Sequence, residues 1–206
     1  MTTEPKIYIV DDDATIRDSM RALLESVDLA VETFPTALDF LNSSENIKTG
    51  CLLLDVQMPD MNGLELQQRL IEQGTSLQII IITGHADVPV AVKSLKAGAL
   101  DFIEKPFKDD VILDCIHRAL EIDEKNSKEL QSLEEAKARV ESLTIREYQV
   151  LEKLIQGHPN KVVAFQLGIS IRTVEVHRAR IFNKTGARNL AHLVRMAMDI
   201  GIDPSS

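Results

Sequence analysis

The sequence predicts an α/β fold with a five-stranded, doubly wound parallel sheet, followed by a helical linker and an all-α domain of four helices. Three observations lead to this prediction. Short apolar runs alternate with amphipathic stretches over residues 1–122, no strand-like run follows Leu143, and the charge changes sign between the two parts of the chain. At roughly 100–200 residues per domain, 206 residues allow one large domain or two small ones.

Five short apolar runs are predicted to be strands. They are rich in Ile, Val and Leu, a composition typical of strands buried on both faces of a parallel sheet. The runs are Ile7–Val10, Val31–Phe34, Cys51–Leu54, Gln78–Ile82 and Leu100–Ile103. In such sheets ligands bind outside the carboxyl ends of the strands, so functional residues are expected directly after each run.

The stretches that alternate with these runs have the spacing of amphipathic helices. They are Ala14–Ser26, Ala37–Leu41, Gly63–Glu72, Val88–Lys96 and Asp110–Glu121. A regular alternation of strand and helix predicts a parallel sheet with helices on both faces.

The back of the chain is predicted to be helical. Residues 122–140 are polar with both charge signs, and Leu130, Leu133 and Val140 share one stripe, which indicates a helical linker or, alternatively, a short dimeric coil. Four short helices are then expected, over Thr144–Ile155, Asn160–Leu167, Ser170–Lys184 and Leu190–Ile200. The predicted domains are therefore residues 1–122, a linker over 123–142, and residues 143–206.

Composition excludes several classes of protein. The chain is 44% hydrophobic and 27% charged, which argues against a wholly disordered protein. No apolar run approaches the ~20 residues of a membrane helix, and no export signal is expected, so the protein is predicted to be cytoplasmic. Cys51 and Cys115 lack metal-ligand spacing and suit buried thiols in a reducing compartment.

The net charge of −9 hides a division between the two parts of the chain. Residues 1–122 hold 10 Lys and Arg against 21 Asp and Glu, a net charge of −11. Residues 143–206 hold 9 against 5, a net charge of +4. An acidic front and a basic back indicate two modules with different partners.

Polar side chains follow four of the predicted strands and should meet at one edge of the sheet. They are Asp11, Asp12, Asp13, Asp55, Thr83 and Lys105. Several carboxylates in one pocket repel one another unless a cation neutralises them, and oxygen ligands suit a hard ion such as Mg²⁺ or Mn²⁺. A carboxylate at such an ion, beside a hydroxyl and an ammonium group, is a good phosphoryl acceptor.

Each of these residues has a simpler interpretation when it is taken alone. Asp11–Asp13 could form a solvated loop or a helix N-cap, Asp55 and Lys105 could belong to turns, and Thr83 could be a strand-end hydroxyl. Their joint occurrence, each after a different strand, favours the phosphoryl-acceptor site.

The front of the chain resembles the receiver domain of bacterial response regulators. The motifs are VDDD at 10–13, LLLDVQMPDMNG at 52–63, IIIITGH at 79–85 and DFIEKPF at 101–107. The resemblance implies a flavodoxin-like receiver, phosphorylated by a separate sensor histidine kinase. It implies the following roles: Asp55 as phosphoacceptor, Asp11, Asp12, Asp55 and the Gln57 carbonyl as magnesium ligands, Thr83 and Lys105 as phosphate contacts, and Phe102 as an aromatic switch. His85 is interpreted as a surface loop residue.

The basic back of the chain contains a helix-turn-helix pattern. The pattern consists of a helix over Asn160–Leu167, a tight turn at Gly168 and a second helix over Ser170–Lys184. In the second helix, Val174 and Ile181 should face inward. The outward face suits the DNA major groove, and its flanks suit phosphates. The expected DNA contacts are Lys161, Arg172, Thr173, Glu175, Val176, His177, Arg178, Ala179, Arg180 and Lys184.

This segment resembles the LuxR-type DNA-binding domain of NarL and FixJ response regulators, and the stretch TVEVHRA is most similar to the FixJ branch. Glu175 and Ala179 stand where NarL-like members present lysine to DNA, so base recognition is expected to differ. The resemblance implies a homodimer formed on phosphorylation through Val88–Lys96 and Leu100–Ile103, which binds promoter DNA and activates transcription with RNA polymerase.

Within that dimer surface, Val90, Ala91 and Ser94 are expected to be exposed, whereas Val88, Val92 and Leu95 are expected to pack on the sheet. Before phosphorylation, the acidic front either masks the basic module or is held apart from it by the linker. Two other functions are weighed: a phosphotransfer scaffold with a helical interaction module, and a Mg²⁺-dependent phosphatase using Asp55. The sequence offers no separate general acid or substrate cleft, so no enzyme activity beyond its own phosphoryl uptake and hydrolysis is expected.

Overall fold

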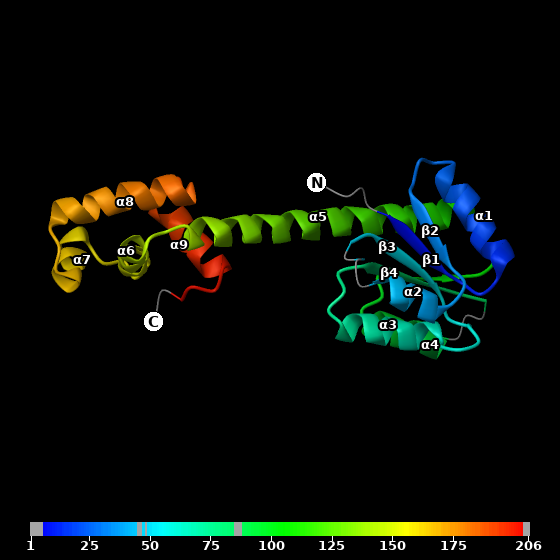
Figure 1. Ribbon diagram of the computed structural model, residues 1–206. Coiled ribbons are helices and arrows are strands. Elements are labelled where there is room, and N and C mark those ends of the chain that lie inside the picture. Colours follow the sequence, from blue (N-terminus) through cyan, green and yellow to red (C-terminus); the bar gives the residue numbers. More distant parts are fainter. Residues whose placement is uncertain (1–5, 45–46, 48, 85–87, 204–206) are drawn as a thin grey trace. The chain divides into compact units, whose positions relative to one another are not determined.

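The computed structural model describes residues 6–44, 47, 49–84 and 88–203, and it divides into two compact units (Figure 1). The first unit is Met1–Ser127 and the second is Lys128–Ser206. The first contains a sheet covered by helices, and the second consists of helices.

The first unit follows the predicted alternation of strand and helix. Its elements are β1 (Ile7–Val10), α1 (Ala14–Glu25), β2 (Val31–Phe34), α2 (Ala37–Ser43), β3 (Cys51–Asp55), α3 (Gly63–Glu72), β4 (Gln78–Thr83), α4 (Val88–Lys96), β5 (Asp101–Glu104) and the first part of α5 (Asp109–Glu141). All five strands are parallel, in the order β2-β1-β3-β4-β5. The predicted five-stranded, doubly wound sheet is therefore confirmed.

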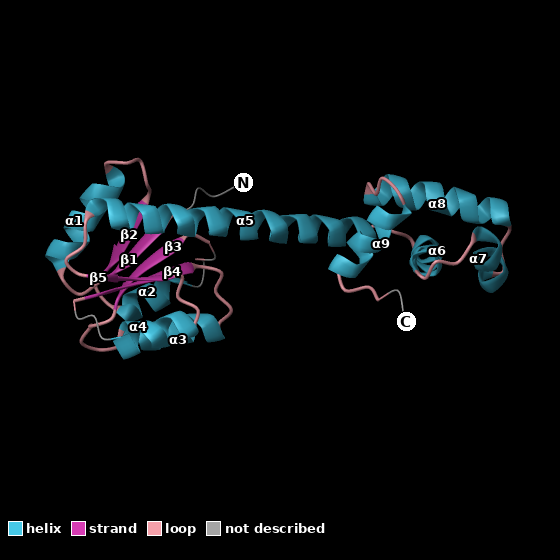
Figure 2. Cartoon of the chain, turned by 180° about the vertical axis from the view of Figure 1, so that it is seen from behind, coloured by secondary structure: helices cyan, strands magenta, loops and turns pink. Residues whose placement is uncertain are grey.

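Each face of the sheet carries its own hydrophobic core, as Figure 2 shows for the helices on either side. Leu52 and Leu54 of β3 pack with residues of α2 and α3, whereas Cys51 and Leu53 pack with residues of α1 and α5. Because successive side chains of a strand point to opposite faces, a continuous apolar run is what a doubly covered strand needs.

The strand order determines where a site can form. The chain leaves β1 toward β2 on one side and leaves β3 toward β4 on the other, so the order reverses between β1 and β3. At such a switch point the two connecting loops diverge and open a crevice at the carboxyl ends of the strands. The residues after β1 and β3 lie at this crevice.

The orientation of α4 corrects the sequence analysis. Ser94 is fully buried, and Ala91 and Val90 are half-buried, whereas the exposed fractions of Val88, Val92 and Leu95 are 72%, 44% and 47%. The Ser94 hydroxyl donates to the Ala91 carbonyl and Gln67 of α3 donates to the Ser94 carbonyl, so the helix packs through its small, polar side. The prediction from hydrophobicity that Val88, Val92 and Leu95 pack on the sheet is therefore wrong.

The second unit contains the four predicted helices and the end of α5. They are α6 (Ile145–Ile155), α7 (Asn160–Leu167), α8 (Ile171–Thr185) and α9 (Leu190–Asp199). Thr144 and Glu147 form a capping box at the start of α6, and Ser170 caps α8. Gly168 ends α7 with φ 65°, a left-handed conformation that allows the tight turn into α8.

The predicted linker is helical and continuous with the last helix of the first unit, because α5 runs through all 33 residues from Asp109 to Glu141. Val140 is buried in the core of the second unit, and Leu130 and Leu133 are 56% and 38% exposed. The dimeric coil stays a prediction. Across the described ranges, no helix combines the length and apolarity needed to span a bilayer.

Candidate functional site

The carboxyl ends of β1, β3, β4 and β5 bring together the polar residues that the sequence singled out. Asp11 follows β1 and is buried, Asp55 ends β3 and is buried, and Thr83 ends β4 with 1% exposure. Lys105 follows β5, in a cis peptide bond to Pro106. Two acids, a hydroxyl and an ammonium group therefore lie at one edge of the sheet.

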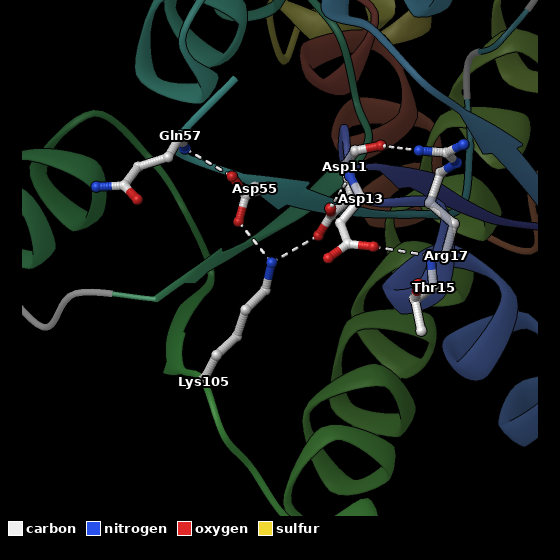
Figure 3. A network of polar contacts seen from close by, with 7 residues as sticks. All are labelled: Asp11, Asp13, Thr15, Arg17, Asp55, Gln57 and Lys105. Atoms are coloured by element: carbon white, nitrogen blue, oxygen red, sulfur yellow. Dashed lines mark hydrogen bonds and ion pairs between the residues drawn. The ribbon is translucent and has the colours of Figure 1, made fainter. Parts of the chain in front are cut away.

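Lys105 joins the two buried acids directly (Figure 3). Its Nζ lies 2.6 Å from Asp11 Oδ2 and 2.7 Å from Asp55 Oδ1. Charge-assisted hydrogen bonds of this length are among the strong polar contacts in proteins. Since the Lys105 side chain is only 17% exposed and that of Asp11 only 4%, little water screens the interaction.

The pKa values follow from this burial. Burial raises the pKa of the Asp55 carboxyl above its ordinary value, although the hydrogen bond from Lys105 acts against the rise. Burial lowers the pKa of the Lys105 ammonium, but its hydrogen bonds to Asp11 and Asp55 outweigh that effect, and the net pKa is raised. Lys105 therefore stays charged at neutral pH and favours the carboxylate form of Asp55.

The loop after β3 shapes the surroundings of Asp55. The Gln57 backbone N–H donates to Asp55 Oδ2 at 2.6 Å, so both carboxylate oxygens of Asp55 have donors. A Cβ atom at Gly63 would lie 2.1 Å from the Asp55 carbonyl oxygen. Only glycine allows α3 to begin so close to the strand end that carries Asp55.

The start of α1, next to the loop after β1, contains a residue that the sequence did not single out, Arg17. Asp13 caps α1 through a hydrogen bond from the Thr15 N–H, as the alternative interpretation of this aspartate proposed. Arg17 of α1 folds back and donates from Nη1 to the Asp11 carbonyl oxygen at 2.6 Å. The available signal was an arginine one helical turn beyond an N-cap, from which a long side chain can reach over the helix start.

The donor set suits a hard divalent cation. No three acidic, histidine or cysteine side chains within the described ranges converge as a ready-made metal site, and Asp12 is exposed. However, Asp11 and Asp55 already share one cation, the Lys105 ammonium. Mg²⁺ commonly uses one or two carboxylates and keeps several waters, so these two acids and the Gln57 carbonyl fit such an ion.

Phe102 lies on β5 and is half-buried, packed at the margin of the core between the sheet, α2 and α3. Its ring is therefore in contact with the core and also within reach of solvent. His85 lies outside the described residues.

The second unit places most of the expected DNA contacts on an accessible surface. Val174 and Ile181 of α8 are fully buried, as expected. The exposed residues of the set are Lys161, Arg172, Glu175, Val176, Ala179, Arg180 and Lys184, and the half-buried ones are Thr173, His177 and Arg178. The outward face of α8 is thus a basic and polar surface.

Arg178 and Lys184 of this set form side-chain hydrogen bonds within the unit itself. Arg178 donates to the Asn160 side chain at 2.8 Å. Lys184 donates to Glu147 at 2.7 Å and to the Ser142 carbonyl at 3.1 Å, so its ammonium group is turned toward α6. His177 is half-buried, and its Nδ1 is buried without a hydrogen-bond partner.

Comparison with protein families finds two matches that together cover most of the chain. Residues 7–117 match the response regulator receiver domain, and residues 141–197 match the bacterial regulatory proteins of the luxR family.

Individual relatives match over nearly the full length. The transcriptional regulatory protein FixJ of Bradyrhizobium diazoefficiens is 44% identical over 202 residues, covering 98% of each chain. The response regulator protein TmoT of Ectopseudomonas mendocina is 44% identical over 94% of this chain and 88% of its own. The structure of the response regulator StyR is similar with a TM-score of 0.86 and 39% identity, over 95% of this chain and 99% of its own.

Proposed function

Because the chain belongs to the response regulators that join a receiver domain to a LuxR-type DNA-binding domain, we propose that Asp55 is its phosphoryl acceptor and that phosphorylation controls DNA binding by α8. The family is that of phosphorylation-dependent transcription regulators with FixJ-like relatives.

One observation supports Asp55 above all others: it is a buried carboxylate held by the ammonium group of a half-buried lysine at the switch point of the sheet. A buried acid keeps its negative charge only when partners stabilise it, and here Lys105 and the Gln57 N–H do so. Those donors favour the carboxylate form of Asp55 and hold the side chain in one place, which are properties that a phosphoryl acceptor needs.

The proposed transfer uses the residues around Asp55 to position and neutralise charge. A carboxylate oxygen of Asp55 attacks the phosphorus of a phosphohistidine on a sensor kinase, the P–N bond breaks, and the imidazole keeps the electron pair and takes up a proton. Lys105 and Thr83 would then bind phosphoryl oxygens. Asp11, Asp12, Asp55 and the Gln57 carbonyl would hold a Mg²⁺ or Mn²⁺ ion, which would supply further charge neutralisation.

The switch is proposed to run through Thr83 and Phe102 to α4 and β5. The corrected orientation of α4 changes which residues form the dimer surface: Val88, Val92 and Leu95 make an exposed apolar stripe, whereas Ser94 is buried. Burial of this stripe against a second copy would stabilise the phosphorylated homodimer. Two copies can then bind two DNA half-sites.

DNA binding is assigned to the exposed face of α8, with Arg172, Glu175, Val176, Ala179 and Arg180 facing the bases. Lys161, Thr173, His177 and Arg178 would contact phosphates. Lys184 is assigned a structural role instead of a DNA contact, because its ammonium group is hydrogen-bonded to Glu147 and Ser142. Bound at a promoter in the cytoplasm, the dimer would activate transcription with RNA polymerase.

Phosphoryl uptake tests the acceptor. The full chain is incubated with acetyl phosphate and Mg²⁺, and its mass is measured. We expect one phosphoryl group on the wild type and none on Asp55→Asn, whereas Asp12→Asn should take up the group more slowly. Equal labelling of Asp55→Asn and the wild type would show that another residue is the acceptor.

Promoter binding tests the second half of the proposal. Genomic fragments bound by the phosphorylated wild type are selected, and their affinity is then measured with and without phosphorylation. We expect phosphorylation to tighten binding and Arg180→Ala to weaken it. A phosphorylated chain that selects no fragment would contradict the assignment to DNA.

A further inference from the structure

We propose that Arg17 of α1 is a positioning residue that orients the Asp11 carboxylate toward the divalent cation. This inference rests on the proposed function of the acidic pocket. It concerns a side chain that does not itself face the reacting atoms, and it follows from the polar network in Figure 3.

The Asp11 carbonyl needs a hydrogen-bond donor. Asp11 lies just beyond Val10, the last residue of β1 that pairs with β2 and β3, and it is only 2% exposed. A buried carbonyl without a partner is costly and rare. Arg17 Nη1 supplies the donor at 2.6 Å, in a charge-assisted hydrogen bond.

This bond completes a set of contacts that determine the direction of the Asp11 side chain. The Asp11 N–H donates to the Phe34 carbonyl at 3.3 Å, and Asp11 Oδ1 accepts from the Asp13 N–H at 2.9 Å. The other carboxylate oxygen, Oδ2, consequently points into the pocket, where it meets Lys105 at 2.6 Å. With its main chain held on both sides, Asp11 presents one defined oxygen to a cation.

Arg17 is itself anchored to the start of α1. Its backbone N–H donates to the Asp13 carbonyl at 3.0 Å, while the Asp13 side chain accepts from the Thr15 N–H at 2.8 Å. The same residue therefore connects the end of β1 to the first turn of α1. Residues that hydrogen-bond to a metal ligand, without contacting the metal themselves, orient that ligand.

Arg17 has two effects on cation binding, and these effects have opposite signs. The positive charge of its guanidinium repels a divalent cation, so removal of the charge alone would tighten binding. Loss of the oriented Asp11 carboxylate would weaken it. The sign of the change in affinity therefore distinguishes positioning from simple electrostatics.

The test uses the full chain with Mn²⁺ as the probe and no phosphoryl donor. Unbound Mn²⁺ is measured by electron paramagnetic resonance, and Asp11→Asn identifies the share of binding that belongs to the pocket. We expect Arg17→Gln to weaken Mn²⁺ binding by about tenfold or more. Unchanged or tighter binding would overturn the proposal.

Arg21→Gln is the matched control. Arg21 lies one turn further along α1 and hydrogen-bonds the Thr33 side chain instead of Asp11. The variant removes the same charge from the same helix, and we expect it to keep the affinity of the wild type. If Arg21→Gln weakened Mn²⁺ binding as much as Arg17→Gln, general loosening of α1 would be the cause and the proposal would fail.

A second variant covers the case in which Arg17→Gln does not fold. Arg17→Lys keeps the charge but has a shorter side chain with one donor group, so we expect weaker Mn²⁺ binding than in the wild type. Wild-type affinity in this variant, if Arg17→Gln is unfolded, would overturn the positioning role.

Phosphoryl uptake separates this inference from the proposed function. In acetyl phosphate, Arg17→Gln should need about tenfold more Mg²⁺ for half-maximal uptake while keeping the wild-type rate at saturating Mg²⁺. A wild type that is not labelled on Asp55 would refute the proposed function. A labelled wild type together with unchanged Mn²⁺ affinity in Arg17→Gln would refute this inference alone.

Discussion

Lys105 contacts two carboxylates that lie 94 and 50 residues before it in the chain. The single positive charge of the ammonium group offsets part of the negative charge of Asp11 and Asp55, and it lies where it contacts both acids. A divalent ion that binds these acids must therefore compete with Lys105. The proposed cofactor and the proposed phosphate contact are coupled through the same two carboxylates.

Glu147 provides a pH-dependent prediction for the second unit. The hydrogen bond from Lys184, followed by that from the Thr144 N–H, lowers the pKa of the Glu147 carboxyl from 4.5 to about 2. Because the folded-state pKa is depressed, the carboxylate contributes its full stabilisation above pH ~5 and loses it as the pH falls toward 2.

Glu147→Gln keeps the capping oxygen but removes the charge. We expect a loss of about 1 kcal/mol in the unfolding free energy of the second unit at pH 7, shrinking toward zero near pH 2. Hydrogen exchange of the α6 and α8 amides measures this loss. Glu152→Gln, the same change on the same helix, serves as control, and a pH-independent difference would contradict the prediction.

Gln67 is a buried polar residue with an incomplete set of partners. Its Nε2 donates to the Ser94 carbonyl at 2.9 Å, but its buried Oε1 has no partner. The Ser94 carbonyl also accepts from the Ala99 N–H, so it remains bonded without Gln67.

Gln67→Met replaces the side chain by an apolar one of similar size. We expect the unfolding free energy of the first unit to stay unchanged or rise by up to about 1 kcal/mol, because an unsatisfied buried acceptor is removed. Urea unfolding measures the effect, with the exposed Gln68→Met as control. A loss of more than about 1 kcal/mol would show that the Gln67–Ser94 contact outweighs the unpartnered oxygen.

At the scale of an element, α4 shows that the packing of a helix is decided by its fit to its neighbours. The small side chains at Ala91 and Ser94 allow close approach, and the larger Val88, Val92 and Leu95 remain outside. An exposed stripe of this kind costs little in the monomer and becomes favourable when a second surface covers it.

Leu95→Asp tests this stripe. The side chain is exposed, so the unfolding free energy of the unphosphorylated protein should change by less than about 0.5 kcal/mol. The phosphorylated homodimer should weaken about tenfold or more, because an apolar contact is replaced by a charge. Sedimentation with acetyl phosphate measures this, and Leu38→Asp, an equally exposed leucine on α2, should have no effect. An unchanged dimer in Leu95→Asp would remove α4 from the interface.

At the scale of the whole molecule, the two units have opposite charges and separate cores. All residues of the acidic pocket lie in the first unit, and all proposed DNA contacts lie in the second. A net charge of −9 would discourage binding to DNA if it were spread evenly, but residues 143–206 carry an excess of basic residues, and Arg172 and Arg180 are exposed on α8. Net charge is therefore a poor guide to the partners of a chain with two modules.

Salt dependence tests the DNA-binding unit. With ~5–8 phosphate contacts per dimer, the logarithm of the association constant should fall with the logarithm of salt concentration with a slope of about −4.5 to −7. Lys161→Ala should reduce this slope by about 2, one for each protomer. Lys184→Gln should leave it unchanged, since Glu147 and Ser142 hold that ammonium group. A reduced slope in Lys184→Gln would mean that Lys184 turns to the DNA instead.

The sequence by itself determined the order of the elements, the switch point and the residues at the strand ends. Apolar periodicity and chemical identity are local properties, and the parallel sheet then brings Asp11, Asp55, Thr83 and Lys105 to one edge. Only the tertiary structure decided which side of α4 is buried, that Lys184 pairs with Glu147, and that Arg17 reaches Asp11. These contacts depend on how closely separate segments of the chain approach one another. A local sequence pattern allows several rotations of a helix about its axis and several partners for a long side chain, and only packing selects among them.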